Sequence, residues 1–229
     1  MAMAAREGAV SGPRDVVATA LSQGGALGIP FFAAHLCGFL GALAWAEDVR
    51  GEAATTTLTT INGRTAVFVA RTITSIVVAL LCALACCLVV FAVIGASIGW
   101  NTALSDPAQL AVQAIRTVGS FAFLTVVYAN TTVILRSATL AVFAVLAAQF
   151  LAEPLVRGVV LLVPSLQRFI DELPYLPFGA ADSLRAPSLH DAGFSLLDRP
   201  GTTAAVAESS VVMLALLATA AACFRLRDP

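Results

Sequence analysis

Four charged residues stand together between two long apolar stretches and are the most chemically distinctive group in the sequence: Glu47, Asp48, Arg50 and Glu52. Each would cost about 3 kcal/mol to place in the hydrocarbon of a bilayer, so the group must lie in water. Carboxylates and a guanidinium held in water are suited to recognising the charges of a soluble protein partner. We therefore expect a docking surface here, with an ordinary solvated loop as the alternative interpretation.

His35, Glu153 and Arg157 are ionisable residues in or beside apolar stretches, and we treat them as candidates for a substrate path. Glu153 and Arg157 are one helical turn apart, so an i,i+4 ion pair would neutralise both at the membrane surface. An ionisable group within a span, such as His35, indicates a functional site by default. A neutral imidazole bonded to a neighbouring helix is the structural alternative for His35, and we favour it.

The sequence also excludes several kinds of chemistry. All 13 basic residues are arginines, so the chain can build neither a P-loop nor a lysine Schiff base. The apolar stretches contain no Ser/His/Asp set, no HExxH motif and no paired carboxylates, so we expect no enzyme activity. The 5 cysteines lack metal-ligand spacing, so we expect small packing residues and no metal or cofactor on this chain. A net charge of -1 without a basic patch argues against nucleic acid as a partner.

The composition requires a lipid bilayer as the surroundings of the chain. Hydrophobic residues make up 59% of the 229 residues and charged residues 12%, which leaves too little polar surface to cover a soluble globule of this size. We predict an all-α polytopic transmembrane helical bundle that forms one domain over residues 1–229.

Five apolar stretches are predicted to be spans, because about 20 helical residues cross a hydrocarbon core of about 30 Å. They are residues 26–45, 73–98, 111–129, 138–155 and 203–224. Ala34, Gly38 and Ala42 repeat every four residues, which places small side chains on one stripe of the first span where another helix can approach closely. Trp45 is expected at the membrane interface at the end of that span.

The third and fourth spans must be separated by a bend. A single helix from 109 to 151 would be about 60 Å long, twice the thickness of a bilayer core. We assign the bend to the polar cluster formed by Asn130, Thr131, Thr132, Arg136 and Ser137.

Three segments are expected outside the spans. Residues 1–25 form an N-terminal segment, and residues 46–71 form a loop with a short helix along the membrane face, followed by a turn and the start of the next span. Residues 158–202 include an amphipathic stretch from Gly158 to Leu173 whose apolar stripe faces a charged one. That pattern predicts a re-entrant or interfacial helix.

The loop at 46–71 resembles a known motif. Its order of Glu47, Arg50-Gly51, a Thr-rich stretch, Arg64 and Arg71 is similar to the first cytoplasmic loop of the permease subunits of type-two ABC exporters, particularly their compact actinobacterial forms. In that family a coupling helix in this loop meets the ATP-binding subunit. Glu52 stands where the family usually has threonine, so this position departs from the pattern.

Two later stretches support the same resemblance. Glu153-Pro154 together with residues 176–182 resembles the outer re-entrant region of the family, and residues 224–228 resemble its terminal basic cap. The family has six spans, and residues 1–25 resemble the loop after its first one, so we expect that span to be missing here.

The resemblance implies a multi-pass transport subunit of the bacterial plasma membrane rather than an enzyme. It implies a cytoplasmic coupling loop, an outer re-entrant helix, and a separate ATP-binding subunit that carries ATP and magnesium. It also implies pairing with a second copy or a sister permease. The alternatives are an ATPase-independent immunity or scaffold protein and an intramembrane hydrolase.

Overall fold

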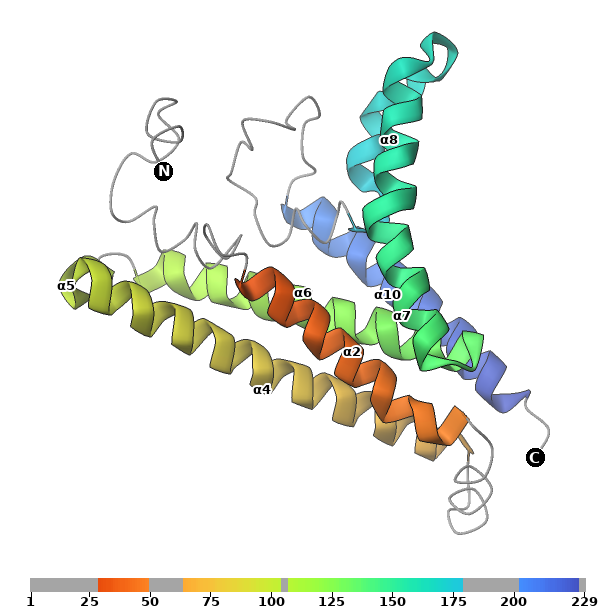
Figure 1. The fold of residues 1–229 in the computed structure, drawn as a ribbon, viewed down its shortest axis with the longest axis horizontal. Coiled ribbons are helices and arrows are strands. Elements are labelled where there is room, and N and C mark those ends of the chain that lie inside the picture. Colours follow the sequence, from red (N-terminus) through yellow and green to blue (C-terminus); the bar gives the residue numbers. More distant parts are fainter. Residues whose placement is uncertain (1–28, 50–63, 104–106, 179–201, 227–229) are drawn as a thin grey trace.

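The structure is a computed structural model that describes residues 29–49, 64–103, 107–178 and 202–226. Nearly all of these residues lie in helices (Figure 1). Four helices are long and apolar enough to cross a membrane: Thr65–Ser97, Leu110–Leu135, Ala138–Leu162 and Val206–Arg225. A shorter apolar helix, Phe32–Ala46, falls in the first predicted span. For the described residues, the prediction of an all-α chain with several helices long and apolar enough to span a membrane is therefore confirmed, while the count of five spans stays a prediction.

Helix α6 (Pro107–Leu135) is the centre of the fold. Helices α2 (Ile29–Val49), α4 (Arg64–Ile98) and α10 (Thr202–Arg225) all pack against it. The most apolar window of α6 is 67% buried, against 22% for α4 and 11% for α10. The outer helices therefore turn long apolar faces away from the protein, which is the distribution expected of helices surrounded by lipid.

The small-residue stripe predicted on the first span lies in the contact between α2 and α6. Ala34 and Ala42 are buried, and a Cβ atom added to Gly38 would overlap the ring of Tyr128. A Cβ atom on Gly41 would lie 2.8 Å from Cγ2 of Thr125, closer than side chains normally approach. Small side chains therefore let these two backbones come together, as the prediction required.

The bend between α6 and α7 (Ala138–Ala147) is shorter than predicted. Arg136 has a φ of 56°, in the left-handed region that ends helices, and Ser137 then caps α7 by accepting a hydrogen bond from the Leu140 amide at 3.3 Å. Two residues thus make the whole connection.

The remaining polar residues of the predicted bend belong to α6, and the predicted end of the third span at residue 129 was wrong. Asn130 donates from Nδ2 to the Val126 carbonyl at 2.8 Å, and Thr132 donates from Oγ1 to the Tyr128 carbonyl at 2.9 Å. A polar side chain that bonds the carbonyl one turn earlier can remain inside an apolar helix, so these residues do not interrupt it.

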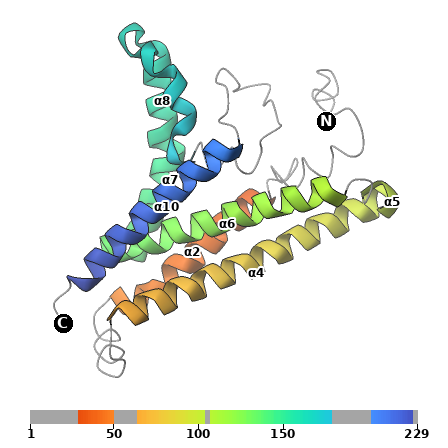
Figure 2. The same ribbon diagram turned by 180° about the vertical axis from the view of Figure 1, so that it is seen from behind.

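The fourth predicted span also continues further than expected. Helix α7 runs through a π-helical turn, η3 (Ala148–Ala152), into α8 (Glu153–Leu162). A 3₁₀ helix, η4 (Pro164–Tyr175), then folds back against α8, and this hairpin extends away from the other helices (Figures 1 and 2). The amphipathic helix predicted over 158–173 is therefore divided at Val163, which is extended because the residue before a proline avoids helical geometry.

After the C-terminal end of α4, the chain turns within a single residue. Gly99 adopts a φ of 89°, a conformation that favours glycine, and the one-turn helix α5 (Trp100–Ala103) follows. The Trp100 ring folds back over Gly95 and lies 5.7 Å from the ring of Phe91. Trp100 is half exposed, as expected of an aromatic residue at a membrane interface.

Replacing Gly38 with alanine is expected to destabilise the protein by about 1 to 3 kcal/mol, because the added methyl group overpacks the contact with Tyr128. Gly119→Ala is the matched control, since its Cβ atom meets nothing within 4 Å and alanine is the better helix former. Thermal unfolding of both variants in detergent checks this. Equal midpoints for the two variants would contradict the close approach of α2 and α6.

Cysteines introduced singly at Asn101 and Leu226 are expected to label from opposite sides of the membrane. Leu226 follows Arg225, which donates a hydrogen bond to Thr65 in the first turn of α4, whereas Asn101 lies just beyond the last residue of α4. The two positions are therefore separated by about the length of that helix. A membrane-impermeant maleimide applied to intact cells, in a background without the native cysteines, measures this. Labelling of both positions from one side would mean that α4 does not cross.

Candidate functional site

Both ends of the predicted coupling loop, residues 46–71, belong to helices: its first residues to α2 and its last residues to α4. Glu47 lies in the last turn of α2, Arg64 is the first residue of α4, and Arg71 lies two turns further along α4. The segment between the two helices is therefore 50–63 rather than 46–71. Arg50, Gly51, Glu52 and the short helix expected there lie outside the described residues.

Three aromatic side chains join the helix ends on either side of this segment. Trp45 of α2, Phe68 of α4 and Phe224 of α10 are all buried, with ring centroids separated by 5.5 Å (Trp45–Phe68), 5.8 Å (Trp45–Phe224) and 5.9 Å (Phe68–Phe224). Aromatic pairs at such distances contribute about 0.5 to 1.5 kcal/mol each beyond the area that they bury. We call these residues the aromatic anchor. The burial of Trp45 was not predicted: its ring is 1% exposed inside this cluster, while its place at the membrane interface stays a prediction.

A polar contact lies beside the aromatic anchor. Arg225, in the last turn of α10, donates from Nε to Oγ1 of Thr65 in the first turn of α4 at 3.2 Å. A cation in the last turn of a helix also interacts favourably with the helix dipole. Arg225, which belongs to the predicted basic cap of the last span, is thus hydrogen-bonded to the helix that follows the predicted loop.

Three helix ends are joined to one another at this end of the molecule. The segment 50–63 is attached to α2 on one side and α4 on the other, and both attachment points are locked to each other and to α10 (Figure 1). Packed rings resist deformation, since protein interiors have low compressibility. A pull on the segment would therefore displace three helices together.

His35 lies elsewhere on α2, facing α6. Its Nδ1 atom and the hydroxyl of Tyr128 share a hydrogen bond of 3.0 Å, and its ring lies 5.7 Å from that of Phe150 in η3. The bond to a neighbouring helix that the structural interpretation required is therefore present. Whether His35 also lies on a substrate path stays a prediction.

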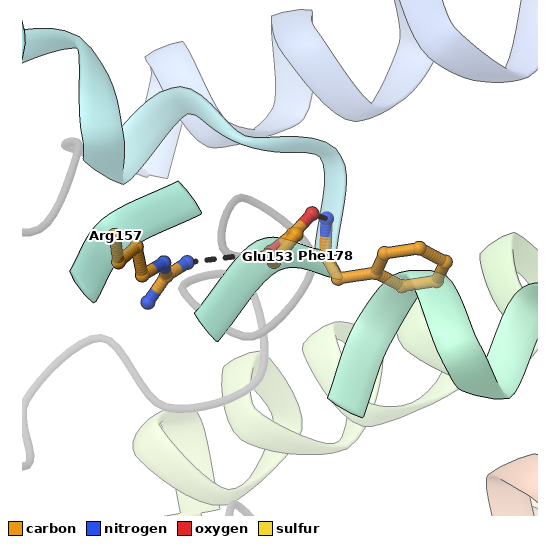
Figure 3. Close-up of polar contacts among 3 residues, drawn as sticks. All are labelled: Glu153, Arg157 and Phe178. Carbon is orange, nitrogen blue, oxygen red and sulfur yellow. Dashed lines mark hydrogen bonds and ion pairs between the residues drawn. The ribbon is translucent and has the colours of Figure 1, made fainter. Parts of the chain in front are cut away.

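Glu153 and Arg157 form the predicted ion pair, with 3.4 Å between Nη2 of Arg157 and Oε2 of Glu153 (Figure 3). A second contact was not predicted. The amide of Phe178 donates to Oε1 of Glu153 at 2.7 Å, so the carboxylate holds the end of the returning segment beside the base of α8. The ring of Phe178 then lies edge-on to Phe123 of α6 at 6.4 Å. Glu153 and Phe178 together fix the α8–η4 hairpin to the central helix.

The predicted sites fall into two groups. His35 contacts Phe150, which lies three residues before Glu153, so the candidate substrate-path residues gather around η3 and α8. The loop residues belong to the other group, next to the aromatic anchor, and Trp45 is about 15 Å along α2 from His35. Within the described parts of the chain, no cluster of three or more His, Cys, Asp or Glu side chains could hold a metal ion.

Sequence reasoning missed the aromatic anchor and the bond between Glu153 and Phe178. The anchor joins residues from three separate helices, and no spacing within one helix reports such a contact. The Phe178 bond joins residues 25 positions apart through a backbone amide. The proline before Phe178 was the available signal, because it marks the place where the returning segment changes direction.

Comparisons of the chain with protein families, with curated proteins and with solved structures found no match. The resemblance to exporter permeases therefore stays a prediction.

Replacing Glu153 with alanine is expected to cost about 1 to 3 kcal/mol, because it leaves the buried Phe178 amide without its acceptor. Hydrogen exchange of the amides in residues 164–178 should accelerate. Arg157→Ala is the control, since it removes the more exposed partner of the ion pair and keeps the bond between Glu153 and the Phe178 amide. Equal exchange in the two variants would contradict the role of Glu153 in fixing the hairpin.

Proposed function

We propose that this chain is the membrane-spanning permease subunit of an ATP-driven exporter of the type-two ABC kind. The segment 50–63, with Glu47, Arg64 and Arg71 on its flanks, docks a separate ATP-binding subunit. That partner carries ATP and magnesium, so this chain supplies transport and no catalysis. A second copy or a sister permease completes the transporter in the bacterial plasma membrane, with the loop on the cytoplasmic side.

The aromatic anchor is the observation that carries this proposal. An ordinary loop needs no rigid base, yet the helices that flank 50–63 are clamped to each other and to α10 by buried rings and by the Arg225–Thr65 bond. A clamp of this kind favours a segment on which a partner exerts force. The apolar outer faces of α4 and α10 support the membrane setting.

The mechanism that follows is mechanical. Closure of two ATP-binding subunits on ATP draws their docked segments together, and each segment moves α2, α4 and α10 through the aromatic anchor. Helix α6 is the surface against which these helices shift, since all three pack on it. Two alternative packings of the bundle then expose the substrate path to opposite sides, and ATP binding sets the equilibrium between them.

The charges of the loop test the proposal. Arg50→Glu/Glu52→Arg is expected to leave the protein inserted and folded, because charges in water seldom contribute more than about 1 kcal/mol to stability. The wild-type chain is expected to capture a separate P-loop ATPase in mild detergent, and the variant should weaken that capture, since like charges would then face each other at the contact. ATP-dependent export should fall with it.

The matched control reverses two exposed charges of opposite sign far from the loop, Arg168→Asp/Asp171→Arg in η4. It is expected to leave capture and export unchanged. Pull-down at matched expression, followed by transport into inverted vesicles, measures both variants. Undiminished capture together with undiminished export in the loop variant would end the assignment of this segment as the docking site.

A further inference from the structure

A groove of about 480 Å³ lies between α6 and α10, nearer the N-terminal end of each helix. Its walls are mostly apolar and include Ile115 and Phe123 from α6 and Met213 from α10. Gly119 contributes open space, because a Cβ atom added to it would meet nothing within 4 Å. The volume lies within the roughly 300 to 1,000 Å³ typical of sites for small molecules, so the groove can hold a ligand.

Ser209 of α10 is the residue of the groove that packing alone does not explain. It is 6% exposed, and its hydroxyl has no hydrogen-bond partner among residues 29–49, 64–103, 107–178 and 202–226. Neighbouring Ser210 differs, because it donates to the Val206 carbonyl at 2.7 Å. A buried hydroxyl without a partner costs free energy unless something else bonds it. A serine hydroxyl turns about a single χ1 bond, so Ser209 can donate to an acceptor placed in the groove.

The groove opens on the apolar outer surface of the bundle. Ile115 is 71% exposed, and Val112 and Val206 on the same rim are half exposed. The lining runs along α6 from Val112 to Phe123, a distance of about 16 Å at a rise of about 1.5 Å per residue. That distance is about half of a hydrocarbon core of about 30 Å, which is the share of one leaflet. The length of the groove and its apolar rim therefore fit one acyl chain of the bilayer.

The position of Ser209 matches the place where a bilayer lipid carries its hydrogen-bond acceptors. Ser209 lies three residues beyond Val206, where the apolar part of α10 begins, and is therefore about 4.5 Å along the helix from that point. Hydrocarbon offers no acceptor, whereas the ester carbonyls of a glycerolipid lie where the hydrocarbon core meets the interfacial region. Arg116 also lines the groove but already has an interaction within the protein, so no preference for headgroup charge follows from it.

We propose that this groove holds one acyl chain of a bilayer glycerolipid, and that the Ser209 hydroxyl donates a hydrogen bond to the ester carbonyl of that acyl chain. The acyl chain lies along Ile115, Phe123 and Met213, which supply van der Waals contact. The hydrogen bond gives the site a preference for ester-linked over ether-linked lipids, because an ether linkage lacks the carbonyl oxygen. The inference holds whether or not the protein is a transport subunit.

Native mass spectrometry of the purified protein, titrated separately with a diester phosphatidylcholine and with the diether analogue of the same chain length, tests the proposal. The two lipids share one headgroup, so any electrostatic contribution from Arg116 is the same for both. The wild type is expected to bind the diester about two- to tenfold more tightly, which is the factor that one neutral hydrogen bond supplies. Equal affinity of the wild type for the two lipids would overturn the proposal.

Two serine variants locate the preference within the groove. Ser209→Ala is expected to bind the two lipids with equal affinity, because it removes the donor. Ser210→Ala is the matched control and should keep the preference, since it changes the neighbouring lining residue, whose hydroxyl is already bonded to its own helix. A preference that survives in Ser209→Ala, or that is lost equally in both variants, would count against Ser209 as the donor and overturn the proposal.

Gly119→Leu tests the place of the acyl chain separately. The leucine side chain extends into open space in the groove and should weaken the binding of both lipids. Undiminished binding of both lipids by this variant would overturn the proposal, because the acyl chain would then lie elsewhere. Tighter binding of the free fatty acid of the same length than of the diester would also overturn it, since the occupant would then not be a glycerolipid. The serine pair decides the matter if Gly119→Leu fails to fold.

Discussion

Helix α2 can lie directly against α6 because glycines face Tyr128 and Thr125 where larger side chains would hold the two backbones apart. In a bilayer there is no hydrophobic driving force between helices, so close approach and van der Waals contact must supply the attraction. The rest of the arrangement depends on this contact. It sets the position of His35 against Tyr128, and it brings the end of α2 to the place where Trp45 meets Phe68 and Phe224.

The bundle is joined by buried rings at the end from which α7 departs. Around Trp45, three helix ends share these rings, and α7, which begins just after the neighbouring end of α6, carries α8 and η4 away from the other helices (Figure 2). Glu153 is the link that limits this separation, because its carboxylate and the Phe178 ring hold the base of the hairpin to α6. A motion that begins at the clamped end would therefore reach the hairpin through α6.

The sequence was most informative where one helix alone decides the outcome. The stripe of Ala34, Gly38 and Ala42 and the ion pair of Glu153 with Arg157 follow from helical periodicity, and both are present. The prediction from sequence failed where polar residues were taken to mark the end of a helix. Asn130 and Thr132 donate hydrogen bonds to carbonyls of α6 itself and so remain within that helix. The sequence also did not predict the burial of Trp45, because packing against two other helices is a property of the tertiary fold that no single stretch encodes.

The length of α4 has a consequence for the membrane in which the protein works. Its apolar span covers 33 residues, or about 50 Å, while a typical hydrocarbon core is about 30 Å thick. Even at a tilt of about 40°, the upper end of what spanning helices show, it would reach across about 38 Å. The excess strains either the lipid or the helix, so acyl-chain length in the host bilayer becomes a control on the shape of the bundle, and thick membrane regions become its preferred surroundings.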